Sequence, residues 1–153
     1  MKAICKQWPK RTDIFSRRKR SAVMAAVRSH GNRTTELKLA VLLRLNRING
    51  WRRRQPLFGK PDFTFSRRKL AVFVDGCFWH GCPVHGTKPK QNAEFWRAKI
   101  SRNQARDRLV TRTLRARGWR VLRIWEHELR RKNERRLVRR LLGAMSRTAT
   151  GGA

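Results

Sequence analysis

Residues 74–85, VDGCFWHGCPVH, gather cysteines and histidines in a chain that has only three cysteines and four histidines in all. Cys77, Cys82 and His85 lie in this stretch, and His127 lies just past the end of a later apolar run. Two thiolates and two imidazoles form the tetrahedral ligand set of a structural zinc site. We therefore expect zinc at these four residues, provided that the two segments lie side by side.

Two questions about these residues stay open. The thiols could instead be small core residues and the histidines surface groups. His80 is a fifth candidate ligand, but a tetrahedral ion takes only four. An imidazole that stays free of metal beside carboxylates is suited to acid–base chemistry, because it titrates near neutral pH.

Acidic side chains are rare, with nine Asp and Glu against forty Lys and Arg, so each one carries information. Asp62 follows a proline at the start of a short predicted strand, Asp75 ends the next one, and Glu36 precedes both on a predicted helix. Carboxylates that meet at one sheet end would form a hard-oxygen site for magnesium, which can neutralise a scissile phosphate and activate water. Each acid could instead pair with an arginine or favour a helix N-terminus.

Two Phe-Trp pairs, Phe78-Trp79 and Phe95-Trp96, also stand out. Core packing accounts for at least one ring of each pair. Exposed members would insert between base steps of a duplex and unstack it, while neighbouring arginines contact the phosphates.

The charge of the whole chain indicates its partner. The 153 residues carry a formal net charge of +31, and neutralising phosphates releases counterions, so nucleic acid is expected to bind. No stretch approaches the roughly 20 apolar residues of a membrane span, and no N-terminal segment resembles a cleavable signal. An odd number of cysteines fits a reducing compartment. We expect a cytoplasmic, nucleoid-associated protein of bacterial type with no membrane partner.

The elements that position these residues begin with a helix. The run GNRTTELKLAVLLRLNR predicts it by its helical spacing of apolar residues. Thr34 or Thr35 is the expected cap. Leu37, Val41 and Leu45 are expected on one face, with Leu42 alongside.

The rest of the chain alternates strands and helices. Residues 62–65 and 70–75 are predicted strands of a hairpin, 94–116 a long basic helix ended by Gly118, 119–125 a further strand and 128–142 a closing helix. This order predicts an α/β fold with a small central mixed sheet flanked by helices. The predicted organisation is a flexible basic arm at 1–20, one folded domain at 21–143 and a disordered tail at 144–153.

Four motifs, GKPDF, AVFVDGCFWHGC, EFWRAKISRNQARD and GWRVLRIWEHEL, occur in that order along the chain. Together they resemble the very short patch repair (Vsr) DNA mismatch endonucleases, roughly over residues 17–140. The resemblance implies a restriction-endonuclease-like fold. It also implies an enzyme that nicks one strand of a duplex, 5′ to the thymine of a T·G mismatch left by deamination of 5-methylcytosine.

The resemblance implies roles for individual residues as well. The magnesium-binding aspartate of the family falls on Asp62 and its catalytic histidine on His80. Its helix glutamate falls on Glu36, and the aspartate of its RD segment falls on Asp107. The intercalating aromatics fall on Phe78, Trp79 and Trp96, and the structural zinc ligands on Cys77, Cys82, His85 and His127.

The chain departs from the family pattern at several of these positions. Some members have Thr-His where this chain has Val74-Asp75. The backbone carbonyl of Val74 can still bind magnesium. With Asp75 in place of a histidine, a step that a histidine assists would be lost, unless Asp75 binds the metal directly instead. Gly81 follows His80 where some members run several histidines together, and His127 stands where some have cysteine.

These observations predict a magnesium-dependent, strand-nicking DNA endonuclease with a structural zinc ion. It is expected to act as a monomer on duplex DNA that contains a mismatch, with mismatch-repair proteins as further partners. In this hypothesis His80 is the general base, and Asp62 holds magnesium together with Asp75 or the Val74 carbonyl. Glu36 positions water or metal. The alternatives are a restriction-type or structure-specific nuclease of the same fold and a non-catalytic, zinc-containing nucleic-acid-binding protein.

Overall fold

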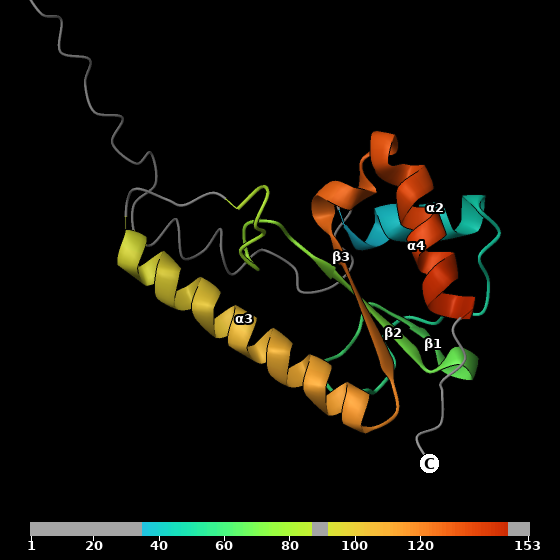
Figure 1. Ribbon diagram of the computed structural model, residues 1–153, viewed down its shortest axis with the longest axis horizontal. Helices are drawn as coiled ribbons and strands as arrows, with labels where there is room; N and C mark the ends of the chain where they lie inside the picture. The colour runs from blue at the N-terminus through green and yellow to red at the C-terminus, as the bar shows by residue number, and fades with distance from the viewer. Residues whose placement is uncertain (1–34, 87–91, 147–153) are drawn as a thin grey trace, which may run out of the picture.

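The computed structural model describes residues 35–86 and 92–146, and Figure 1 shows its elements. The strands are β1 (Phe63–Phe65), β2 (Leu70–Asp75) and β3 (Arg120–Trp125), and the helices are α2 (Glu36–Leu45), α3 (Ala93–Ala116) and α4 (Glu134–Ser146). Short 3-10 turns span Ser66–Arg68, Glu126–Leu129 and Arg131–Asn133. This arrangement confirms the predicted α/β class with a small mixed sheet and helices.

The three strands are ordered β1-β2-β3, with β1 antiparallel and β3 parallel to β2. Asp75 at the end of β2 lies opposite Trp125 at the end of β3. Because the strands of a parallel pair run in the same direction, the segments that follow them leave from one edge of the sheet. The cysteine-containing loop, His127 and the start of β1 therefore meet at this edge.

Each face of the sheet packs against different helices, as Figure 1 shows. One face joins α2 and α4 in the larger core, and its β2 members are Leu70 and Val72. The opposite face packs on α3, where Phe73 clusters with Val110. Side chains alternate along a strand, so Asp75, two residues after Phe73, lies on the α3 face as well.

The apolar face predicted for α2 is only partly right. Val41 and Leu45 are 52% and 74% exposed, whereas Leu42, expected alongside them, is buried together with Leu39 and Leu43. Apolar residues cover most of this helix, so their spacing alone did not indicate which side the sheet would contact. Thr35 does precede the helix, but its side chain makes no capping hydrogen bond.

The long helix α3 agrees with its predicted range of 94–116 to within one residue. Gly118 follows it with a φ of +73°. This left-handed conformation favours glycine, so the helix stops there and the chain enters β3.

The closing helix α4 begins later than its predicted start at residue 128. Glu128 belongs to a 3-10 turn instead, and its Oε2 accepts a hydrogen bond of 2.8 Å from the N–H of Trp125. Asn133 Nδ2 donates a 2.8 Å hydrogen bond to the carbonyl oxygen of His127. These contacts fold the chain back at the end of β3 and so keep His127 beside the cysteine-containing loop.

At its other end α4 continues to Ser146, so the first residues of the segment 144–153, predicted as a tail, are helical. The rest of that segment, the predicted arm at 1–20 and the first residues of the predicted domain lie outside the described residues. Within the described ranges, no helix combines the length and the apolar character needed to cross a membrane.

Candidate functional site

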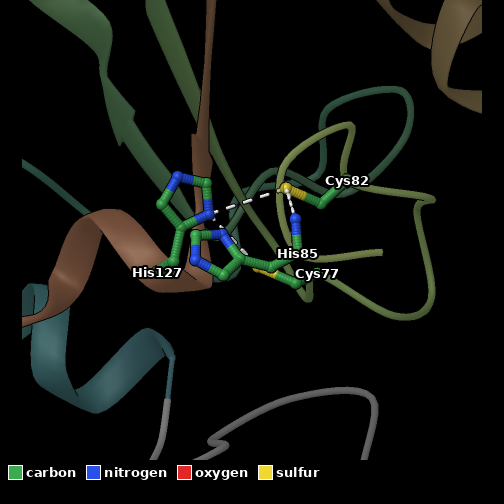
Figure 2. A group of neighbouring side chains, drawn as sticks. All are labelled: Cys77, Cys82, His85 and His127. Carbon is green, nitrogen blue, oxygen red and sulfur yellow. Dashed lines mark hydrogen bonds between the residues drawn. The ribbon is translucent and has the colours of Figure 1, made fainter. Parts of the chain in front are cut away.

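Four side chains from two segments converge where β2 and β3 end, as Figure 2 shows. They are Cys77, Cys82, His85 and His127, and their ligand atoms all lie within 4.8 Å of one another. Both cysteines are buried and free of disulfide bonds. We call this group the Cys/His cluster. The structure thus brings together all four residues that the sequence proposed as one ligand set.

The Cys/His cluster already has internal contacts. Nδ1 of His127 lies 3.3 Å from Sγ of Cys77 and 3.6 Å from Sγ of Cys82. The N–H of His85 donates to Sγ of Cys82 at 3.4 Å. Burial raises the pKa of the Cys77 thiol and lowers the pKa of His127. Both groups therefore favour their neutral forms, and a cation would be needed to hold the thiolate.

Two side chains of α3 donate hydrogen bonds to the backbone of the loop that carries His80. Asn103 Nδ2 donates to the carbonyl oxygen of Trp79 at 2.8 Å, and Gln104 Nε2 donates to that of His80 at 3.2 Å. Gly81 makes this close approach feasible, because it has a φ of +63° and an added Cβ would lie 2.6 Å from Gln104 Nε2. The helix therefore fixes the backbone on both sides of the His80 side chain.

The imidazole of His80 lies between two carboxylates. Its Nδ1 is 2.5 Å from Oδ2 of Asp107 on α3 and 3.7 Å from Oδ1 of Asp75. Burial raises the pKa of Asp107, but the hydrogen bond with His80 and the charge of Arg123 lower it more, so the net pKa is below its ordinary range. An ionised Asp107 accepts the proton on Nδ1, which leaves Nε2 of His80 to accept another.

Arg123 is a residue of this site that the sequence reasoning missed. Its Nε and Nη2 each lie 2.6 Å from an oxygen of Asp75, and Nη2 also lies 2.9 Å from Oδ1 of Asp107. Its guanidinium stacks 5.0 Å from the ring centre of Phe73, its neighbour in the parallel register. No sequence signal placed it beside Asp75, because the face on which Arg123 lies follows from the register of β2 and β3.

Asp62 reaches the same edge of the sheet but has different neighbours. Its Oδ2 accepts a 2.7 Å hydrogen bond from the N–H of Val74. Burial is the main cause that raises the pKa of Asp62 from 3.8 to about 6; the charges of Glu36 and Asp75 also raise it, against the lowering effect of the Val74 hydrogen bond. The carboxylate therefore sits among like charges that a cation would compensate.

Glu36 lies near Asp62, as the sequence proposed, and is itself buried. It forms a 2.5 Å ion pair with Arg53. Asp62, Glu36 and Arg53 line a cavity of about 220 Å³. Asp75, His80 and Asp107 form a separate group of possible metal ligands among the described residues, and Asp62 does not belong to it. The predicted acids therefore divide into two groups, Glu36 with Asp62 and Asp75 with Asp107.

The raised pKa of Asp62 makes a prediction about stability. In magnesium-free buffer at pH 8, Asp62→Asn is expected to raise the free energy of unfolding by about 1–2 kcal/mol and the melting temperature by about 2–6 °C. The folded protein binds the Asp62 proton more tightly than the unfolded chain does, so this carboxyl destabilises the fold increasingly as pH rises from 3.8 to about 6. Thermal melts from pH 4 to pH 8 test this, and an equal effect at both ends would contradict it.

The aromatic residues proposed to contact a ligand also come together. Phe78, Trp79 and Trp96 meet edge to face, with ring centres 5.1–6.0 Å apart. All three are partly exposed. Phe95, which is 57% exposed, packs against Trp96. Phe78, Trp79 and Trp96 thus form an aromatic cluster in the loop that carries His80 and on the first turns of α3.

The arrangement is suited to removing a proton from water. A general base needs a fixed position and an acceptor nitrogen, and the contacts of His80 with Asp107 supply both. A hard cation would suit the buried carboxylate of Asp62 at the same edge of the sheet.

Comparisons with known proteins agree with this chemistry. The family model described as DNA mismatch endonuclease Vsr matches residues 12–86. The type II nicking enzyme V.NaeI of Lentzea aerocolonigenes is 58% identical over 45% of this chain and 42% of its own length. The type II nicking enzyme V.NmeAIP of Neisseria meningitidis serogroup A is 40% identical over 88% of this chain and 99% of its own. The DNA mismatch endonuclease Vsr of Escherichia coli K12 is 35% identical over 77% and 76%. The match therefore spans less than half of V.NaeI but nearly all of V.NmeAIP.

Proposed function

Because this chain belongs to the Vsr family of DNA mismatch endonucleases, we propose that it nicks one strand of duplex DNA at T·G mismatches. Cleavage would occur 5′ to the thymine by magnesium-dependent hydrolysis of the phosphodiester. The observation that carries the proposal is the pairing of His80 with Asp107 in the loop that also bears the aromatic cluster. A purely structural nucleic-acid binder has no need of an imidazole held in this way.

His80 is the general base in this proposal. Its Nε2 would accept a proton from the attacking water, and the negative charge of Asp107 would stabilise the imidazolium that forms. The role requires no rearrangement of the loop, because Asn103 and Gln104 already hold its backbone.

Asp62 and the backbone carbonyl of Val74 are the proposed magnesium ligands, with Glu36 nearby to orient bound water. The raised pKa of Asp62 supports this assignment, since it arises mainly from burial and further from the charges of Glu36 and Asp75, and a bound cation would offset both effects. A bound magnesium ion would supply Lewis-acid stabilisation of the charge that develops on the phosphate. Asp75 is assigned to positioning instead, because both of its oxygens accept hydrogen bonds from Arg123.

The Cys/His cluster is proposed to hold a structural zinc ion. Two sulfur and two nitrogen ligands suit zinc, and four protein ligands leave no open position for chemistry. The ion would tie the loop that bears His80 to the end of β3.

The aromatic cluster and the basic surface are proposed to bind the mismatched duplex. Phe78, Trp79 and Trp96 would insert between base pairs near the mispair, and a net charge of +31 would favour the backbone.

A strand-resolved nicking assay tests the proposal. Matched duplexes with a T·G or a T·A pair in a methylation-site context are compared, each with and without magnesium. We expect a magnesium-dependent cut only in the thymine strand of the T·G duplex. Equal cutting of both duplexes would favour a restriction-type enzyme, and binding without cutting would favour a zinc-stabilised binder.

A further inference from the structure

We propose that Arg123 is a positioning residue that holds His80 in its reactive orientation by joining Asp75 on β2 to Asp107 on α3. The inference rests on the proposed function, because it concerns the same imidazole. It also explains why an aspartate stands at position 75, where some members of the family have histidine.

The first step is the state of Asp75. Its side chain is only 5% exposed, and both oxygens accept hydrogen bonds from one guanidinium. A buried carboxylate is tolerated when it is paired in this way. Asp75 therefore holds the guanidinium of Arg123 in place.

The second step is the bridge from Asp75 to the base. Nη2 of Arg123 lies 2.6 Å from Asp75 and 2.9 Å from Asp107, whose other oxygen lies 2.5 Å from His80. The contacts run from β2 to β3, then to α3 and finally to the loop after β2. Arg123 thus fixes Asp107 in the place where it can orient the imidazole.

The third step is the geometry of the arginine itself. The planar guanidinium has donors in a rigid fork, so it can contact two carboxylates at once, whereas a lysine ammonium on a flexible stem is less suited to this. Stacking on Phe73 restricts the plane of the fork further. The site therefore depends on the shape of this side chain as well as on its charge.

The competing explanation is that Arg123 only neutralises buried charge and stabilises the fold. Arg123→Met alone cannot separate the two explanations, because it would leave Asp75 buried without its partner and could unfold the protein. The double variant Asp75→Asn with Arg123→Met removes both charges and keeps similar volumes. In this variant no unpaired charge is buried at position 75, but Asp107 still loses its contact with Arg123.

The experiment measures single-turnover nicking and DNA affinity for the full-length chain with zinc and magnesium. The double variant is expected to melt near the wild-type temperature and to bind the T·G duplex within about threefold, yet to nick about 100-fold more slowly, as misplaced catalytic groups do. Arg123→Lys, which keeps the positive charge, is expected to nick faster than the double variant but more slowly than the wild type. Arg139→Met, which removes an exposed arginine on α4, is the control for the loss of one arginine and should nick at the wild-type rate.

A spectroscopic readout tests the inference without relying on catalysis. An imidazole N–H that is held by a carboxylate gives a downfield proton NMR signal, and loss of the signal in His80→Ala would assign it. We expect this signal to disappear or broaden in the double variant and to persist in Arg139→Met.

The outcomes separate the two ideas. The role of Arg123 would be overturned if the wild type nicks the T·G duplex and the double variant nicks it equally fast with an unchanged NMR signal. A wild-type protein that cuts neither duplex would overturn the proposed function, while the NMR signal would still decide whether Arg123 holds His80.

Discussion

Replacing His80 with alanine is expected to lower the single-turnover nicking rate by about 10²–10⁴-fold, the usual contribution of a general base. DNA affinity should change by less than about threefold, because the imidazole is engaged by Asp107 and the aromatic cluster stays intact. Rapid-quench kinetics on the T·G duplex and a parallel binding titration measure the two quantities separately.

His80→Gln is the companion variant for this test. Glutamine retains a polar side chain of comparable reach but is not a base near neutral pH, so it should be as inactive as alanine. Parallel losses of nicking and binding in both variants would mean that His80 serves DNA binding, and the assignment as general base would then be abandoned.

Removing one ligand of the Cys/His cluster is expected to have the largest effect on stability. Cys77→Ser should lower the free energy of unfolding by at least about 3 kcal/mol, because a structural zinc ion contributes directly to folding. The variant should also bind less zinc per chain, measured by elemental analysis alongside denaturant unfolding. A zinc chelator should lower wild-type stability toward that of the variant and have little further effect on the variant.

Cys5→Ser provides the matched control, since it removes the third thiol of the sequence, which is not one of the four proposed ligands. It should retain full zinc content and wild-type stability. An unchanged unfolding curve for Cys77→Ser, combined with insensitivity of the wild type to the chelator, would argue against a structural metal.

The features that sequence analysis located are those with a local pattern. The apolar run of β2 fixed its bounds, and the spacing of Cys77, Cys82 and His85 indicated a ligand set before its geometry was known. The hairpin of β1 and β2 and the mixed character of the sheet likewise followed from the order of the predicted elements. The information lies in local runs of residues and in their sequence along the chain.

The features that it missed depend on contacts between distant segments. Asp107 and its partner His80 are 27 positions apart, and only the family resemblance brought Asp107 into the site. Arg123 belongs to a strand that reads as mostly apolar, so its two carboxylate partners became visible only once the register of β2 and β3 was known. The buried face of α2 was misjudged because both sides of that helix carry leucines.

The Cys/His cluster has a consequence for the entropy of the unfolded chain. Cys77 and His127 are 50 positions apart, and the segment between them contains His80, Asp107 and Arg123. A metal ion that joins these ends would act as a cross-link, and the ordering cost of closing such a loop grows with the logarithm of its length. An ion bound at the Cys/His cluster would therefore close one loop around His80, Asp107 and Arg123 without needing a disulfide.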